Sequence, residues 1–289
     1  MHPCILTDEI SQDLDKALDL CCLRGFKAIE VRSVWNTPPH KLSLHQCRDI
    51  VKRATDRGIT IAAFASPVFK SPLPYSASQL AQCESLLVRS IEQCESLGTR
   101  LLRIFSFYRN GKPNVVAAAA AMDAVLTRVP TDGLTLAVET GTRSNTPTAA
   151  LARELLDNLR RSNLGILWDP GNTVFAGFSN SNSNGMDGLT DLLPSDPVHV
   201  HIKDPLGTTG YVELGCGDLA WPKILDALAE RKYQGYLSLE THWRLKKVLN
   251  ATERDEPWGE DFSDGGYEAS NACMATLSRW VTSRMENRA

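Results

Sequence analysis

The sequence predicts an α/β protein with a single (β/α)8 barrel of eight parallel strands, and two observations support this. Short apolar or β-branched segments alternate eight times with longer stretches of helical periodicity. Dividing the 289 residues among eight repeats gives about 36 per unit, close to one strand and one helix of such a barrel. No linker or shift in composition divides the chain, so one domain is expected over residues 1–289. An open doubly wound sheet is the alternative fold.

The strands are expected where the apolar runs lie, at residues 4–7, 26–32, 59–64, 100–105, 133–139, 164–169, 198–203 and 236–240. Right-handed crossovers between consecutive strands make all eight parallel. The carboxyl end of every strand then lies on one rim of the barrel.

Capping residues mark the expected ends of several helices between these strands. The pairs are Ser11 with Gly25, Ser43 with Gly58, and Thr146 with the first-turn residue Pro147. The last long helix is expected over residues 268–285. Two polar segments, 177–188 and 244–266, follow strands and are expected to form lids or loops on the rim.

Composition and charge exclude several classes of protein. The 31 Lys and Arg residues against 34 Asp and Glu give a net charge of −3, which provides no general basic surface for a nucleic acid. No run approaches the ~20 apolar residues of a membrane span. The opening residues carry Asp8 and Glu9 instead of a basic, apolar leader, and the eight cysteines are too dilute for a disulfide scaffold. A cytoplasmic protein is expected.

Four residues that could bind a metal lie at the carboxyl ends of the last four expected strands. They are Glu139, Asp169, His201 and Glu240. They are spaced 30, 32 and 39 residues apart, about one strand–helix unit each. Taken singly, each is more typical of a helix cap, a solvated charge or a core histidine. As a set, they are expected to converge on one rim.

Three carboxylates and an imidazole crowded together would repel one another and shift each other's pKa values unless a cation lay among them. One nitrogen and three oxygen donors without a thiolate suit Mn²⁺, Mg²⁺ or Co²⁺ better than a structural zinc. Mn²⁺ is the first choice for this site, and Mg²⁺, Co²⁺ and Zn²⁺ are the alternatives.

Seven sequence motifs resemble the sugar phosphate isomerase/epimerase family of xylose isomerase-like TIM barrels. They are TDEI at 7–10, IEVR at 29–32, AVE at 137–139, WDPGN at 168–172, HVHIKD at 199–204, GCGD at 215–218 and LSLE at 237–240. The resemblance spans nearly the whole chain and implies a barrel with a metal site. Members include epimerases of free ketoses, hydroxypyruvate isomerases, inosose and dehydroshikimate dehydratases, and a DNA-repair endonuclease.

The resemblance also implies individual roles. His201 stands before the x-Lys-Asp of the motif and corresponds to the metal-binding histidine. His199 would lie one layer deeper on the same face, where a hydrogen-bonded core histidine is the alternative. Lys203 would lie one layer higher, near the substrate, with a surface lysine as the alternative. Asn172 occupies the position where ketose epimerases of the family usually carry a substrate-binding histidine, which argues against a ketose 3-epimerase.

The leading functional hypothesis is a divalent-metal-dependent isomerase or epimerase of a sugar or sugar phosphate. The metal would chelate the substrate's carbonyl and hydroxyl oxygens and stabilise an enediolate intermediate. Glu139 and Glu240 would act as base and returning acid. The expected substrate contacts are Lys203, Asn172, Arg103, Glu30, His242 and His199. A structural ion pair is the alternative for Arg103, and a solvated loop position for His242.

The closest rival is a metal-dependent lyase or dehydratase acting on a keto-sugar, an inosose or a dehydroshikimate-like compound. A non-catalytic sugar-binding barrel is a further alternative. A DNA-repair endonuclease would need a zinc cluster with additional histidine ligands, and the chain has only six histidines. The expected partner is a small carbohydrate, with no nucleic acid and no membrane, and a homo-oligomer is left open.

Overall fold

The barrel predicted from the strand–helix alternation is present in the computed structural model, which describes residues 1–179, 184–192 and 195–286. Its sheet has eight parallel strands in the order β1-β10-β7-β6-β5-β4-β3-β2. The strands are β1 (His2–Ile5), β2 (Ala28–Val31), β3 (Thr60–Phe64), β4 (Leu101–Ile104), β5 (Thr135–Glu139), β6 (Leu164–Trp168), β7 (His199–Ile202) and β10 (Tyr236–Leu239). Each lies at one of the eight expected positions.

The first and last strands of this order close the cylinder. β1 and β2 are joined through one bridge, between Leu6 and Glu30, whereas β1 pairs with β10 along its whole length. Inside the barrel, small side chains fill the layer near the amino ends of the strands, where Cys4, Ala28 and Ala62 pack with Tyr236. Glu30 lies two residues beyond Ala28 on the same face, so it also points into the interior.

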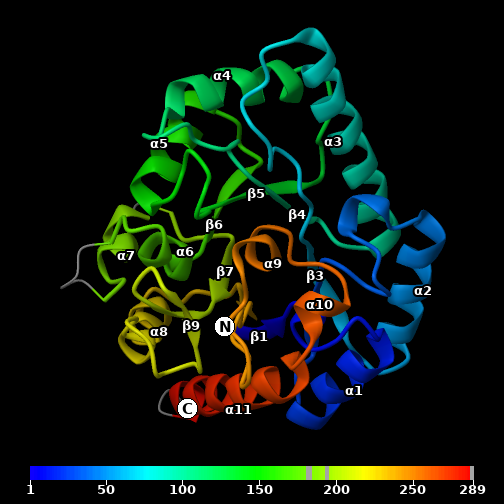
Figure 1. The fold of residues 1–289 in the computed structure, drawn as a ribbon, viewed down its shortest axis with the longest axis vertical. Helices are drawn as coiled ribbons and strands as arrows, with labels where there is room; N and C mark the ends of the chain where they lie inside the picture. The colour runs from blue at the N-terminus through cyan, green and yellow to red at the C-terminus, as the bar shows by residue number, and fades with distance from the viewer. Residues whose placement is uncertain (180–183, 193–194, 287–289) are drawn as a thin grey trace.

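Long helices surround the barrel (Figure 1). They are α1 (Leu14–Arg24), α2 (Leu44–Thr55), α3 (Ala77–Leu97), α4 (Val115–Leu126), α5 (Ala149–Leu159), α8 (Trp221–Glu230) and α11 (Gly266–Glu286). Between β6 and β7 two short helices, α6 (Pro170–Phe175) and α7 (Asp187–Asp191), take the place of one long helix. Part of the polar segment expected at 177–188, residues 180–183, lies outside the described residues.

The helix caps agree with the sequence in part. Ser43 caps α2, forming a reciprocal capping box, and Gly25 ends α1 in the left-handed conformation. The predictions for Ser11 and Thr146 were wrong. Asp13 caps α1 because its carboxylate accepts hydrogen bonds from two backbone N–H groups of the first turn. Thr148 caps α5 because its hydroxyl accepts one hydrogen bond, from the backbone N–H of Leu151.

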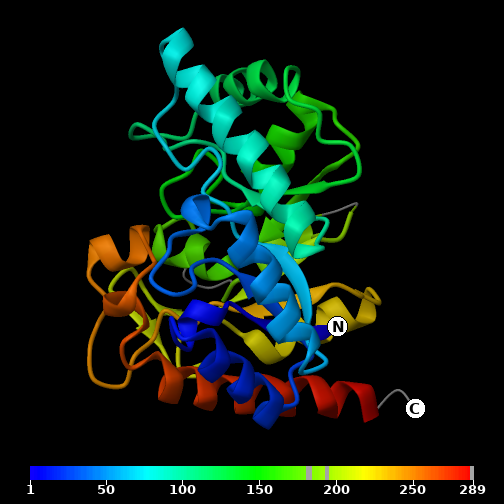
Figure 2. The ribbon, with the colours of Figure 1, turned by 90° about the vertical axis from the view of Figure 1, so that its right-hand side faces the viewer.

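The polar segment at 244–266 forms the cover expected on the rim. It contains α9 (Ala251–Asp255) and α10 (Glu260–Ser263), and Figure 1 shows α9 in front of the strands. In the turned view of Figure 2, both helices lie on the side of the molecule opposite the N- and C-termini. α9 therefore covers the rim that carries the carboxyl ends of the strands.

The sequence did not predict a small antiparallel hairpin that follows β7, formed by β8 (Asp204–Leu206) and β9 (Gly210–Val212). Asp204 accepts backbone hydrogen bonds from Gly215, Gly217 and Leu219. A Cβ at Gly217 would lie 2.4 Å from the Asp204 carboxylate, so only glycine allows this approach. The GCGD motif is thus the turn that fixes the end of the hairpin.

Within the described residues, no helix is long and apolar enough to cross a bilayer. The expectation of one domain over residues 1–289 stays a prediction.

Candidate functional site

The four predicted metal ligands lie together at the carboxyl ends of neighbouring strands. Glu139 is the last residue of β5, Asp169 and Glu240 directly follow β6 and β10, and His201 lies within β7. One ligand atom from each lies within 4.8 Å of all the others, and all four side chains are buried. The Nδ1 atom of His201 is 3.3 Å from Glu240, 3.8 Å from Asp169 and 3.9 Å from Glu139. We call these four residues the ligand set.

The donor atoms of the ligand set fit a divalent ion. Glu139 Oε2, Asp169 Oδ2 and His201 Nδ1 are buried atoms without a hydrogen-bond partner, an arrangement that is costly unless a further group binds them. The Lys203 ammonium lies 2.6 Å from Asp169 Oδ2 and also pairs with Glu240. It supplies one positive charge where the carboxylates carry three negative charges.

The electrostatics of the ligand set reflect this crowding. Burial raises the pKa of Asp169 to about 7, against the opposing effect of Lys203. Burial alone would lower the pKa of His201, but the carboxylates of Glu30 and Glu240 outweigh it and raise that pKa to about 10. For Glu240, burial is outweighed by Lys203, His242 and His201, so its pKa lies well below the usual value.

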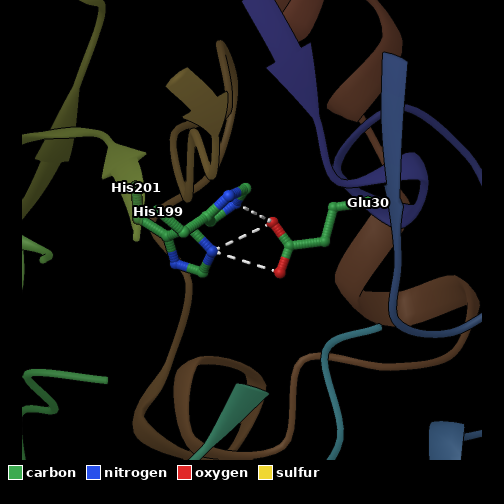
Figure 3. A group of neighbouring side chains, drawn as sticks. All are labelled: Glu30, His199 and His201. Carbon is green, nitrogen blue, oxygen red and sulfur yellow. Dashed lines mark hydrogen bonds and ion pairs between the residues drawn. The ribbon is translucent and has the colours of Figure 1, made fainter. Parts of the chain in front are cut away.

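Glu30 orients the imidazole of His201. Its carboxylate accepts hydrogen bonds from the Nε2 atoms of both His201 and His199, at 3.0 and 2.9 Å (Figure 3). It accepts a further one from the Ser238 hydroxyl at 2.8 Å. With Nε2 of His201 held by Glu30, Nδ1 faces the carboxylates and offers its lone pair once its own proton has left. The carboxylate of Glu30 therefore fixes the orientation of the His201 ring, with Nδ1 as the atom that could bind a metal.

Glu30 and His199, two of the expected substrate contacts, lie below the cavity. Both are fully buried beneath His201, and neither lines the cavity above the ligand set. The sequence placed Glu30 on a strand but did not show how far its side chain lies below the rim. Their contacts place both residues beneath His201, with Glu30 as the acceptor for the Nε2 atoms of His199 and His201.

The other four expected contacts, Lys203, Asn172, Arg103 and His242, line a cavity above the ligand set. Glu139 and Glu240 form part of its floor, and residues of the cover close its mouth. Its free space is about 50 Å³. The barrel therefore holds a small cavity, partly open to solvent, whose lining includes two of the four residues of the ligand set.

Asn172 and Arg103 both contact Glu139. The amide of Asn172 donates to Glu139 Oε1 at 2.9 Å, and the guanidinium of Arg103 lies 3.3 Å from Oε2. Arg103 also donates to the backbone carbonyls of Ala65 and Ser66. The structural ion pair considered for Arg103 is present, and the same side chain lines the cavity.

Lys203 reaches the ligand set because Gly171 leaves room for it. A Cβ at position 171 would lie 2.6 Å from Cγ of Lys203. Lys203 is buried, which differs from the surface lysine considered as its alternative. Its ammonium is thereby held against two carboxylates at the floor of the cavity.

A second buried acidic group, which the sequence did not reveal, lies beside the ligand set. Arg32 pairs with Asp8, Glu9 and Glu240, and Arg244 pairs with Glu9. We call Asp8, Glu9, Arg32 and Arg244 the arginine cluster. The expected strand at 26–32 contained Arg32, but an arginine at a strand end gives no signal of which carboxylates it meets.

His242 contacts the arginine cluster and lies within 4.8 Å of Glu240, one residue of the ligand set. Its Nδ1 atom is 2.8 Å from Glu9 Oε1, and burial lowers its pKa against the opposing effect of Glu9. The backbone of His242 has a φ of 48°, a left-handed conformation that is uncommon outside glycine. This turn directs the chain from β10 into the cover, and His242 lines the cavity wall rather than lying in a solvated loop.

Comparisons with known proteins agree with this architecture. L-Ribulose 3-epimerase superposes with a TM-score of 0.74 at 18% identity, covering 100% of this chain and 97% of the epimerase. D-Psicose 3-epimerase, solved in the presence of D-fructose, gives 0.70 at 18% identity over 97% and 99% of the two chains. A probable 3-DHS dehydratase from Bacillus anthracis, involved in petrobactin synthesis, gives 0.67 at 17% over 96% and 99%. At these identities the likeness shows the fold.

No curated protein sequence matches the chain significantly. Residues 18–263 match the family described as Xylose isomerase-like TIM barrel, which confirms the resemblance seen in the sequence motifs. This match covers most of the chain, including every residue of the ligand set. The chain therefore belongs to the xylose isomerase-like TIM barrel family.

Proposed function

We propose that this protein is a divalent-metal-dependent isomerase or epimerase of a small carbohydrate, working by proton transfer at a carbon next to a carbonyl. The observation that carries the proposal is the ligand set: three of its buried donor atoms have no hydrogen-bond partner, and the four side chains converge beneath a small, partly open cavity. Glu139, Asp169, His201 and Glu240 would hold the ion. Mn²⁺ is the first choice, with Mg²⁺, Co²⁺ and Zn²⁺ as alternatives.

A bound divalent ion supplies a Lewis acid that stabilises negative charge developing on the substrate's oxygens. Glu139 is the better base because Oε2 has no hydrogen bond, while Asn172 holds Oε1 at 2.9 Å. Glu139 would keep the proton that it removes, and Glu240 would deliver a different one from the other side of the cavity. Because the Glu240 carboxylate is ionised, that proton would come from the Lys203 ammonium that pairs with it, and Lys203 would be reprotonated from solvent. Both oxygens of Glu240 are held, by Arg32 and Lys203.

Lys203 gives a specific reason to keep a lyase or dehydratase as the second candidate. Its ammonium lies in the cavity beside Asp169 and Glu240, where it can donate a proton to a departing hydroxyl group. The fold shared with a probable 3-DHS dehydratase supports the same candidate.

The test is to incubate the protein and Mn²⁺ in D₂O with ketoses, inososes and 3-oxo sugars. Deuterium beside the carbonyl without loss of water, detected by mass spectrometry, supports an isomerase or epimerase. A conjugated, ultraviolet-absorbing product supports the lyase. Neither product, with Mn²⁺ shown to be bound, would overturn both.

Glu139→Gln serves as the matched variant on any substrate found in that panel. Removal of a general base lowers turnover by about 10²–10⁴-fold. If the variant turned over the substrate as fast as the unaltered protein, Glu139 would not be the base.

A further inference from the structure

The cavity carries more positive charge than its carboxylates require once a metal is bound. The cationic residues that line it are Arg32, Lys70, Arg103, Arg143, Lys203 and Arg254, and the acidic ones are Glu139, Glu240 and Asp255. Three of the cations already pair with residues of the ligand set: Arg32, Arg103 and Lys203. A divalent ion would neutralise those same carboxylates and leave the cavity with a surplus of positive charge.

Lys70 is a cation without an acidic partner. Among the described residues, its ammonium forms no salt bridge and is influenced only at longer range by Glu139 and Glu240, and it donates to the backbone carbonyl of Asp255 at 2.5 Å. The rings of Phe105 and Trp258 lie 5.3 and 5.8 Å from the Nζ atom. Burial among these groups lowers the pKa of Lys70 to about 8. An unpaired ammonium in such surroundings favours an anion.

Arg143 lies at the mouth of the same cavity and already binds a carboxylate. Its Nη1 atom is 2.6 Å from Asp255 Oδ2, and its guanidinium stacks on the ring of Tyr108 at 4.2 Å. The stacking fixes the plane of the guanidinium. Lys70 and Arg143 come from different strand–helix connections, yet both meet Asp255, the last residue of α9.

Asp255 therefore occupies both cations at the mouth: its carboxylate binds Arg143, and its backbone carbonyl binds Lys70. The free space beneath it is about 50 Å³, well below the about 300 Å³ at the lower end of small-molecule pockets. A sugar can enter only if the cover moves. When α9 moves away, Lys70 and Arg143 lose the groups that they now bind.

We propose that Lys70 and Arg143 bind an anionic group of the substrate, a carboxylate or a phosphate, in the place that Asp255 occupies when the cover is closed. This inference rests on the proposed function, because the carbonyl end of the same molecule would lie at the ligand set. The substrate class is then an acidic sugar or a sugar phosphate, with its charge at the end remote from the metal.

Three probes that differ only at carbon 6 test this: D-fructose, D-fructuronate and D-fructose 6-phosphate. Each is titrated calorimetrically into the full-length protein, with and without Mn²⁺. We expect at least one anion to bind tenfold or more tightly than fructose, and the two anions distinguish carboxylate from phosphate. Equal affinities for all three, or no binding by either anion, would overturn the inference.

Variants of Lys70 and Asp255 separate the specific binding of an anion from general effects of charge. Lys70→Met is expected to remove the tenfold preference while leaving fructose affinity within twofold, and Lys70→Arg is expected to retain the preference. Asp255→Asn, which removes the competing carboxylate, is expected to strengthen anion binding by three- to tenfold. Its matched control is Glu256→Gln on the adjacent exposed residue, with no change expected.

Opposite results count against the inference. An Asp255→Asn variant that binds the anions no better than Glu256→Gln would show that Asp255 does not occupy their site. The metal proposal is tested separately by titration with Mn²⁺ alone. Normal Mn²⁺ binding without any anion preference would overturn only the inference, whereas a Lys70-dependent preference without Mn²⁺ binding would overturn only the metal proposal.

Discussion

The ligand set and the arginine cluster are neighbouring groups of buried acids that differ in how their charges are balanced. In the arginine cluster, both oxygens of Glu9 accept hydrogen bonds, Oε1 from Arg32 and His242 and Oε2 from Arg244 and Thr241. In the ligand set, one donor atom in each of Glu139, Asp169 and His201 accepts no hydrogen bond, although Lys203 and Arg103 form ion pairs with Asp169 and Glu139. In the arginine cluster, Asp8 Oδ1 is the one such atom among the described residues.

This difference decides which acidic group is suited to a metal. Ligand atoms of Glu9, Glu240 and His242 also lie within 4.8 Å of one another, so distance alone would favour a second site there. The oxygens of Glu9 are already occupied by fixed cations. Close spacing of carboxylates therefore indicates a metal site only where protein donors leave their lone pairs free.

The comparison predicts its largest effect in the arginine cluster. Arg32→Met would leave Asp8, Glu9 and Glu240 without their shared counterion, and removal of one partner from a buried ion pair costs about 3–5 kcal/mol. We expect the free energy of unfolding in urea to fall by this amount.

Lys52→Met provides the control for Arg32→Met. Its ion pair with Asp56 is exposed and is worth less than about 1 kcal/mol. If both variants lost stability equally, the arginine cluster would not be the structural element described above.

The second prediction concerns the ligand set. Asp169→Asn keeps an oxygen to cap α6 but removes one charged ligand, so we expect Mn²⁺ affinity to fall at least about 100-fold in calorimetric titrations. The free energy of unfolding of the metal-free variant should change by less than about 1 kcal/mol, because Lys203 still pairs with Glu240. A loss of stability as large as that of Arg32→Met would erase the distinction between the two groups.

A smaller effect is expected one step away from the metal. Glu30→Gln weakens the acceptor that holds the Nε2 proton of His201, and such supporting changes reduce metal affinity by about 10–100-fold. The measurement is again a Mn²⁺ titration. An unchanged dissociation constant would show that Glu30 does not orient the imidazole.

The smallest expected effect is on pH dependence. The pKa of His201, raised to about 10, means that it carries a proton at neutral pH that a metal must displace. The metal binds the deprotonated form, so affinity should rise with pH, by about tenfold per unit from pH 7 to 9. Below about 7, where Asp169 is also protonated, the dependence should be steeper. An affinity for Mn²⁺ that does not change over pH 6–9 would contradict these assignments.

The sequence predicted the barrel and the ligand set because both depend on regular spacing along the chain. It could not assign Glu30, since the alternation of a strand tells which face a side chain occupies and not how deep it lies. It also missed Lys70 and Arg143, which lie in connections without periodicity. The hairpin of β8 and β9 was missed for a similar reason, because its strands have only three residues each.

The bridge between Leu6 and Glu30 has a consequence for how the protein assembles. Glu30 takes part both in closing the cylinder, through its bridge to Leu6, and in orienting the His201 imidazole. Glu139, Asp169, His201 and Glu240 all lie on the last four parallel strands of the barrel, but the acceptor for His201 is contributed by the second strand. A chain in which all four residues of the ligand set have already been synthesised therefore completes the hydrogen bond to His201 only when the second strand, which carries Glu30, has joined the barrel.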